Sequence, residues 1–506
     1  MDVLRRSLSN LPTERILRVA VWTTFLVLIS FTSADPDLWG HVRFGTDILR
    51  DGNIHQIDTY SFDSDRPWVN HEWAAEVVSA WAFTTAGNAG LVFLKLLIIG
   101  SMLWLLNAAL RQEGVRSGFA RDVTAGITVV ITLSQAHHIR PQLYSLLAFS
   151  ALMWCLLAVR RGARGWLLVL PPLFALWANF HGGWIVGGGV MVLWTAALLI
   201  SGEPRQALAL GATGGASLAA TLANPYGFGL WRFLGETVGF SRPEIVEWQP
   251  IYSVAHLIMA LWDASLSIAT LGVILGGREK LRIERLVVGL ALAIASLKVS
   301  RLQAFFALTS VFLFAPLICQ AYERRRMARE FAWSPALRFA FASVACALGL
   351  LAINVISDNF RQVRVDSAWM PEPEAVAVLN RQTAGKRVLV WFNWGEYAIW
   401  HLSPRMLVSM DGRRETVYSD GLQKSHWDFY FDHPGGATLP TELRADYIWL
   451  PRVLPVVPRL RNDSTWTILF EGKGSVIFER VGLPREPESG SKIATAATPL
   501  RVFPGP

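Results

Sequence analysis

Two carboxylates and an imidazole lie directly after the first long apolar run of the chain. Residues 16–34 carry one arginine and otherwise only apolar or hydroxyl side chains, and the run is long enough to span a bilayer as a helix. Asp35, Asp37 and His41 follow where that helix would leave the hydrocarbon, and Pro36 disfavours helical geometry at Asp35. Such side chains could act as a general base or a metal ligand at the membrane surface. The alternative is a set of polar interfacial residues that simply end a span.

The composition indicates a membrane protein with many spans. Of the 506 residues, 52% are hydrophobic, and the mean hydropathy of +0.34 is too high for a soluble globular protein. The 22 tryptophans fit many membrane interfaces, where this residue concentrates. The net charge is +8, but the lysines and arginines fall mainly in short loops between apolar runs, which is typical of topology signals. No nucleic-acid partner is therefore expected. The three cysteines lie inside apolar runs, so neither disulfides nor a cysteine metal site is implied.

About eleven apolar runs predict transmembrane helices of some twenty residues each. They are residues 16–34, 88–110, 120–137, 142–160, 165–181, 183–201, 206–223, 251–276, 284–300, 302–320 and 336–356. If the spans alternate, the basic loops fall on one side, which the positive-inside rule makes cytoplasmic. The amino terminus would then be cytoplasmic, and everything after residue 356 extracytoplasmic. Residues 1–356 are thus expected to form a transmembrane domain with a long first external loop at 35–87.

Unusual polar side chains map to the outer ends of these spans or to the outer loops. Ionisable groups at membrane depth are costly and usually functional, so their gathering on one face predicts an outward-facing polar cavity. Snorkelling or capping residues would explain one or two of them but not the whole set. The set comprises Asp35, Asp37, His41, His71, Glu72, His137, His138, Arg140, His181, Asn224, Glu247, Lys298 and Arg301.

Two stretches of the first external loop have apolar residues at helical spacing. Residues 37–50 predict a short amphipathic helix, and residues 71–85 predict a second one that would lie along the membrane interface. Two such helices in this loop would suit the entrance of an enzyme that acts on a lipid carrier.

Arg140 and Arg301 are candidates to hold a phosphate or diphosphate, because the planar guanidinium fork matches phosphate oxygens. His138, two residues before Arg140, is included in this predicted phosphate site. A tight polar turn before a helix that starts at proline is the alternative for Arg140. An interface anchor is the alternative for Arg301.

The composition changes to that of a soluble domain after residue 356. Short strands are predicted at residues 388–392, 405–410, 446–450, 466–470 and 476–478, and a helix at 373–381. These elements predict a small α/β domain over residues 357–482. The tail at 483–506 is rich in proline, serine, threonine and glycine, and we expect it to be disordered.

Several short motifs resemble those of the GT-C glycosyltransferases. The segment Asp35-Pro-Asp-Leu-Trp-Gly-His41 is similar to the first-external-loop motif of that superfamily, as found in the oligosaccharyltransferase catalytic subunit and in protein mannosyltransferases. The wider resemblance, over nearly the whole chain, is to bacterial GT-C-like membrane proteins that carry DPDLWWH, RPQ, HGG, NPYG and DGR motifs. These motifs correspond to Asp35–His41, Arg140–Gln142, His181–Gly183, Asn224–Gly227 and Asp411–Arg413.

The resemblance implies a polytopic α-helical GT-C-like fold of about eleven spans, with a small extracytoplasmic α/β domain, in a bacterial inner membrane. It implies transfer of a sugar from a polyprenyl-phosphate or -diphosphate donor to a glycan, lipid or protein acceptor on the extracytoplasmic face. In the oligosaccharyltransferase subunit the acidic residue after the first span binds metal and acceptor. Asp35, with Asp37 in support, is the matching catalytic candidate.

A divalent metal, Mg or Mn, is implied only in part. Asp35 and His137 are its candidate ligands, but the second acidic pair of oligosaccharyltransferase, after the third span, is replaced here by His137 and His138. This departure puts metal dependence in doubt.

An aromatic motif in the outer domain resembles the acceptor-reading WWDYG motif of oligosaccharyltransferase. It reads Trp391-Phe-Asn-Trp-Gly395, with Asn393 in place of the aspartate, so sequon recognition is not carried over. A tryptophan-rich strand and turn that packs the domain explains the motif equally well. The residues expected to line the cavity or contact the acceptor are His41, His71, Glu72, His181, Trp391, Asn393, Asp411 and Arg413.

Two rival classes remain at this point. A transporter of a lipid-linked glycan would show inverted repeats and polar groups near the middle of the membrane, and neither is evident. A membrane assembly scaffold would tolerate the loss of Asp35 and Arg140 together. A protein that retains the GT-C fold but has lost catalytic activity is a third possibility.

Overall fold

The computed structural model describes residues 13–238, 246–277, 281–326, 334–366, 369–483 and 501–505. Their contacts group the chain into two compact units. The helical unit comprises Met1–Thr32, Val92–Phe228 and Val238–Arg361. The mixed unit comprises Ser33–Leu91, Gly229–Thr237 and Gln362–Pro506. The segment predicted as the first external loop therefore groups with the C-terminal part of the chain rather than with the spans.

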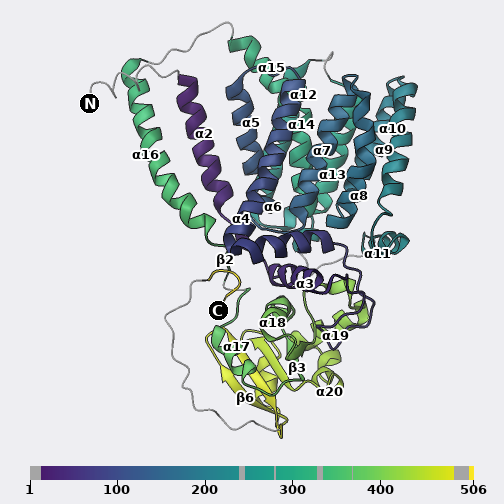
Figure 1. Ribbon diagram of the computed structural model, residues 1–506, viewed down its shortest axis with the longest axis vertical. Helices are drawn as coiled ribbons and strands as arrows, with labels where there is room; N and C mark the ends of the chain where they lie inside the picture. Colours follow the sequence, from purple (N-terminus) through teal and green to yellow (C-terminus); the bar gives the residue numbers. More distant parts are fainter. Residues whose placement is uncertain are drawn as a thin grey trace. The chain divides into compact units, whose positions relative to one another are not determined.

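The helical unit is a bundle of α-helices (Figure 1). Its helices are α2 (Thr13–Ser30), the second part of α4 (Trp73–Gln112), α5 (Gly118–Ile131), α6 (Leu133–Ala136), α7 (Gln142–Arg160), α8 (Leu170–Phe180), α9 (Trp184–Ile200), α10 (Pro204–Ala220), α12 (His256–Gly276), α13 (Ile283–Lys298), α14 (Gln303–Leu313), α15 (Ala315–Arg326) and α16 (Pro335–Phe360). The described residues of this unit also form the 3-10 turns η1 (Arg164–Val169), η2 (Val246–Trp248), η3 (Ile251–Ser253) and η4 (Ser300–Leu302).

Within the described residues, five helices are long and apolar enough to cross a membrane. They cover Trp73–Gln112, Gln142–Arg160, His256–Gly276, Ser300–Arg325 and Pro335–Phe360. Helical structure is present in each of the eleven predicted ranges, but the other helices are shorter than about twenty residues or, like α2, carry several charges. The helical character of the predicted transmembrane domain is therefore confirmed, and the number of spans stays a prediction.

Small residues let neighbouring helices of the bundle approach closely. Helix α2 packs against α5 and α16, and α10 packs against α8 and α9. A Cβ placed on Gly126 of α5 would lie 1.0 Å from Cζ of Phe25 in α2, so any larger residue at this position requires the Phe25 ring to move. Such small-residue contacts are typical of helix packing in membranes.

The first part of the mixed unit contains the two predicted loop helices. Helix α3 (Leu38–Asp51) confirms the first of them. Helix α4 starts at Trp73, two residues after the predicted start. Its backbone breaks at Ala86 and Gly87, where Gly87 adopts a positive φ of 57°. The break separates the second loop helix from the span that follows, which confirms that boundary. A further helix, α11 (Phe228–Val238), was not predicted.

The C-terminal part of the mixed unit is an α/β fold around a five-stranded sheet. The strand order is β4-β3-β5-β7-β6, in which β4, β3 and β5 are parallel while β7 is antiparallel to both of its neighbours. The strands are β3 (Lys386–Val390), β4 (Met406–Val408), β5 (Tyr447–Pro451), β6 (Trp466–Glu471) and β7 (Ser475–Arg480). The helices are α17 (Pro373–Asn380), α18 (Gly395–Leu402), α19 (Asp420–Tyr430), α20 (Leu439–Glu442) and α21 (Val457–Arg461), with the turns η5 (Phe392–Trp394), η6 (Arg414–Thr416) and η7 (Pro434–Gly436). All five predicted strands and the predicted helix are confirmed.

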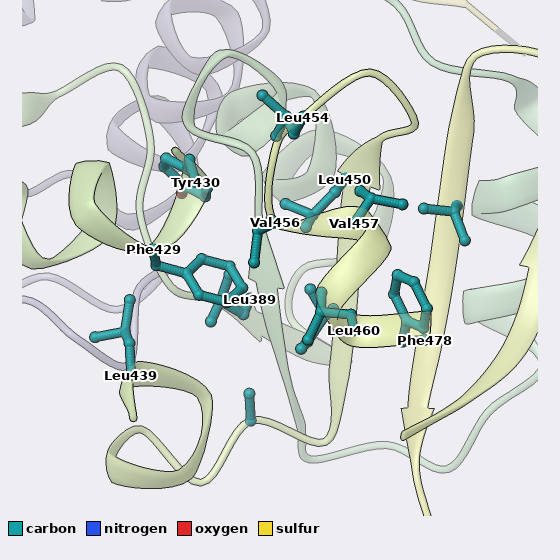
Figure 2. Close-up of a cluster of buried hydrophobic side chains, with 13 residues drawn as sticks. Leu389, Phe429, Tyr430, Leu439, Leu450, Leu454, Val456, Val457, Leu460 and Phe478 are labelled. Carbon is teal, nitrogen blue, oxygen red and sulfur yellow. The ribbon is translucent and has the colours of Figure 1, made fainter. Parts of the chain in front are cut away.

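A buried apolar cluster packs the helices α19, α20 and α21 against the sheet. Figure 2 shows Leu389, Leu450 and Phe478 from the strands beside Phe429 and Leu460 from the helices. Each of these five side chains is almost fully buried. Each Å² of apolar surface that is removed from water stabilises a fold by about 25 cal/mol.

Residues 501–505 are structured, which corrects the expectation of disorder for this part of the tail. Phe503 is 1% exposed and lies among the rings of Trp39, Phe83 and Trp400, with centroids 5.4, 5.2 and 5.8 Å away. Asn88 donates to the carbonyl of Phe503 at 2.7 Å. Residues 484–500 and 506 of the predicted tail lie outside the described residues.

Replacement of Phe503 by alanine is expected to lower the free energy of unfolding by about 3–5 kcal/mol, because it leaves a cavity between the surrounding aromatic rings. The measurement is the midpoint of urea unfolding of the purified protein. Arg501→Ala is the matched control, because that side chain is exposed and only its backbone carbonyl binds Val365. Equal midpoints for the two variants would contradict the packing role of Phe503.

Candidate active site

Asp35 and Asp37 lie at the junction between a short strand and helix α3. Strand β1 (Ser33–Ala34) pairs in parallel with β2 (Arg364–Val365) and ends just before Asp35. The Asp35 carbonyl accepts from the Leu38 amide at 3.3 Å, and Asp37 is the N-cap residue of α3. The side chain of Asp35 is buried. A carboxylate at this end of a helix is favoured by the helix dipole.

A third carboxylate, from Glu396 in the first turn of α18, approaches the same turn. Its Oε2 accepts the backbone N–H of Gly40 at 3.0 Å. A Cβ built on Gly412 would lie 2.4 Å from Oδ1 of Asp37 and 2.9 Å from Oε1 of Glu396, so both carboxylates face this glycine. Glycine at position 412 is what leaves room for the two groups. The approach of Asp37 and Glu396 was not predicted from the sequence.

Burial raises the pKa of Glu396 well above its ordinary value, and the nearby negative charges of Asp37, Asp411 and Asp35 act in the same direction. The positive charge of Arg413 opposes them only in part. This rise in pKa favours the protonated form of Glu396, which can donate a hydrogen bond, whereas an ionised carboxylate cannot. The only sequence signal for Glu396 was its place directly after the motif that ends at Gly395.

Asp411 and Arg413 belong to a buried ion-pair network. Arg413 binds both oxygens of Asp58, at 2.8 and 3.0 Å, and both oxygens of Asp411, at 2.9 and 2.7 Å. Tyr418 donates to Asp411 at 2.7 Å. The guanidinium also lies over aromatic rings, including that of Trp68 at 4.8 Å. These contacts join the segment after α3 to the loop after β4 and fix the turn that carries Gly412.

His41 lies on the next turn of α3, facing acidic groups at the start of α4. Its Nδ1 is 3.6 Å from Oε1 of Glu76, whose other oxygen accepts from Asn70 at 2.5 Å. Burial alone would lower the pKa of His41, but the nearby carboxylate of Glu76 and the negative charges of Glu72 and Asp37 outweigh it and raise the pKa to about 9. His41 is thus a cation at neutral pH.

His71 and Glu72 lie just before the first residue of α4, close to Glu76. The His71 ring lies 5.2 Å from that of Phe233 in α11, and its Nε2 is 3.6 Å from Oε1 of Glu72. The predicted cavity residues His41, His71 and Glu72 therefore lie in one part of the mixed unit.

Trp391 and Asn393 lie in the turn between β3 and α18. Trp391 is half-buried among aromatic rings, including that of Tyr430 with a centroid distance of 4.8 Å. This environment agrees with the packing alternative for Trp391. A contact between Trp391 or Asn393 and an acceptor stays a prediction.

In the helical unit, the charges of the three predicted phosphate-binding residues act on one carboxylate, that of Glu247. Arg140 forms an ion pair with Glu247, which lies on η2. Burial alone would raise the pKa of Glu247, but the positive charges of Arg140, Arg301 and His138 lower it to about 2. The residues predicted from two distant motifs therefore share one electrostatic site.

Arg301 connects this site to His181. Its Nη2 lies 3.2 Å from Nε2 of His181, and its guanidinium lies 5.9 Å from the ring centre of Trp248. The Nδ1 of His181 is 2.6 Å from Oγ of Ser145, which also accepts from the indole of Trp177 at 2.7 Å. His181 is therefore fixed in its orientation, close to the predicted phosphate residues.

The two predicted metal ligands, Asp35 and His137, belong to different units of the chain, and a metal at either of them stays a prediction. In the ranges that the structure describes, no group of three or more histidine, cysteine, aspartate or glutamate side chains is arranged to hold a metal ion. Asp35 belongs to the mixed unit and His137 to the helical unit, where the His137 and His138 rings lie 3.7 Å apart. We therefore assign no step to a metal.

The chain has the fold of the GT-C-type membrane glycosyltransferases. ArnT from Cupriavidus metallidurans is similar in the apo state, with a TM-score of 0.55 and 13% identity, over 94% of this chain and 98% of ArnT. The same protein bound to undecaprenyl phosphate gives a TM-score of 0.53 with the same identity and coverage. The arabinofuranosyltransferase AftD from Mycobacteria gives 0.50 and 14%, over 93% of this chain and 42% of AftD. No family model and no curated protein sequence matches the chain.

Proposed function

We propose that this protein is an integral membrane glycosyltransferase that takes a sugar from a polyprenyl-phosphate or -diphosphate donor. The acceptor would be a glycan, lipid or protein on the extracytoplasmic face of a bacterial inner membrane. The observation that carries the proposal is the placement of buried Asp35 and of Asp37 at the start of α3, beside Glu396 and charged His41. The likeness of the fold to ArnT, solved with undecaprenyl phosphate, supports the choice of donor.

In the proposed reaction, Asp35 is the general base. It accepts the proton of an acceptor hydroxyl, whose oxygen forms a bond to the anomeric carbon of the donor sugar. The bond between that carbon and the phosphate oxygen breaks, and its electron pair leaves with the polyprenyl phosphate. Asp37 supports Asp35, and the raised pKa of Glu396 limits the negative charge that gathers beside them.

The departing phosphate needs positive charge, which Arg140 and Arg301 would supply. His138 lies in the same electrostatic site. We assign the donor phosphate to these residues, with His181 positioned by its contact with Arg301. The α/β part of the mixed unit would then position the acceptor.

The test is transfer from a panel of radiolabelled polyprenyl-phosphate and polyprenyl-diphosphate sugars by the purified protein. We expect label to leave the lipid for at least one donor in the presence of membrane extract as a source of acceptor. A donor that binds without ever being cleaved would favour a carrier of lipid-linked glycans or an inactive GT-C fold. A protein that binds none of the donors would favour a scaffold.

A further inference from the structure

The carboxylate of Glu247 lies among the positively charged side chains to which we assign the donor phosphate. Two guanidinium groups and one imidazole act on it, from Arg140, Arg301 and His138. Arg140 is directly paired with it. Carboxylate and phosphate oxygens offer a guanidinium the same planar, two-point partner. Glu247 therefore has the chemistry of a built-in substitute for a phosphate.

Hydrogen bonds that do not involve the carboxylate hold the backbone around Glu247 in place. The hydroxyl of Ser300 donates to the carbonyl of Glu247 at 3.0 Å, and the Ser300 amide donates to the carbonyl of Gln249 at 3.0 Å. These bonds hold η2 against η4, which carries Arg301. The Glu247 side chain is 37% exposed, whereas that of its partner Arg140 is 19% exposed. The carboxylate can thus swing away from Arg140 without breaking the backbone contacts that position it.

Charge balance gives this carboxylate a direct effect on anion binding. Arg140 and Arg301 carry two fixed positive charges, and the pKa of Glu247 near 2 keeps it ionised at any physiological pH. One of the two positive charges is therefore already neutralised before a donor arrives. An incoming phosphate must displace the carboxylate from Arg140, or it binds more weakly because less positive charge is left to attract it.

We propose that Glu247 is an internal competitor at the donor phosphate site, whose carboxylate occupies the position on Arg140 that phosphate oxygens take when a lipid-linked phosphate binds. This inference rests on the proposed function, because it uses the same arginines. It adds a residue that limits donor affinity and favours release of the polyprenyl phosphate after transfer. A purely structural salt bridge would act in the opposite sense, since Glu247 would then orient Arg140 for the phosphate.

The test is the affinity of the purified full chain in detergent for farnesyl phosphate, a short polyprenyl monophosphate, at constant ionic strength. Glu247→Gln keeps the size of the side chain and removes its charge, so we expect binding to become roughly tenfold tighter. Glu236→Gln is the matched control, because Glu236 is an exposed glutamate of α11 and makes the same change of net charge. Its affinity should equal that of the wild type. Inorganic phosphate, used as a competitor, separates headgroup binding from binding of the isoprenoid chain.

The outcomes separate this inference from the proposed function. Weaker or unchanged binding by Glu247→Gln, with the wild-type melting temperature retained, would overturn the role of internal competitor. If Arg140→Gln still abolished binding in that case, the donor phosphate site itself would stand. If Arg140→Gln bound farnesyl phosphate as well as the wild type does, both the phosphate site and the competitor would be wrong.

Discussion

Replacement of Asp35 by asparagine is expected to lower the rate of sugar transfer by roughly 10²–10⁴-fold, the usual contribution of a positioned general base. Asparagine has nearly the same shape as aspartate, so the turn between β1 and α3 should be retained, but its amide cannot accept the proton of the acceptor. The affinity for the donor should not change, because the residues that we assign to the phosphate are Arg140, Arg301 and His138. The measurement is the initial rate of label transfer at saturating donor.

Asp420→Asn is the control for this variant. Asp420 is exposed at the start of α19, and the substitution makes the same chemical change away from the acidic cluster. We expect it to transfer sugar at the wild-type rate. A wild-type rate in Asp35→Asn as well would remove Asp35 from the reaction, and Asp37→Asn would then be the next variant to examine.

Replacement of Arg413 by methionine is expected to destabilise the protein by about 3–5 kcal/mol, the usual result when one partner of a buried ion pair is removed. Asp411 and Asp58 both lose their guanidinium partner, and the side chain of each is at most 1% exposed. Methionine retains much of the apolar volume against Trp68, so the loss should reflect charge rather than a cavity. The measurement is the midpoint of urea unfolding, compared with the wild type.

Arg461→Met is the matched control for the ion-pair network. Arg461 also binds a carboxylate with two nitrogens, that of Glu471, but the side chains of this pair are 34% and 30% exposed. Exposed pairs contribute little to stability, so we expect no measurable change in the midpoint. An Arg413→Met variant as stable as Arg461→Met would show that the buried network does not support the fold.

Local patterns in the sequence were sufficient for most individual elements. Helix α3, the start of α4 and the strands of the sheet follow from the period of their apolar residues, which depends only on neighbouring positions. The break at Gly87 was also predictable, because a polar, glycine-containing stretch separates the two apolar patterns. The number of spans was harder to judge, since several helices are shorter than the apolar runs that predicted them.

Long-range contacts could not be read from the sequence. Glu396 lies at the turn of Asp37 because α18 packs against α3, although the two helices are more than 350 residues apart in the sequence. No local sequence pattern predicts that contact. Phe503 was assigned to a disordered tail because its neighbours have a disordered composition, although a single aromatic side chain anchors the segment. Arg140 and Arg301 were identified by residue type and by their place at the outer ends of predicted spans. Their common partner Glu247 was visible only as one polar residue among many.

The most direct test of the central claim is phosphorus NMR of the donor that the panel identifies, incubated with acceptor and with either wild-type protein or Asp35→Asn. A transferase with Asp35 as its base predicts that wild-type protein converts the sugar-linked phosphate signal into that of free polyprenyl phosphate or diphosphate. Asp35→Asn should bind the same donor and leave its signal unchanged. Donor bound by both proteins and cleaved by neither, or cleaved equally by both, would contradict the assignment of glycosyl transfer to the acidic cluster at the start of α3.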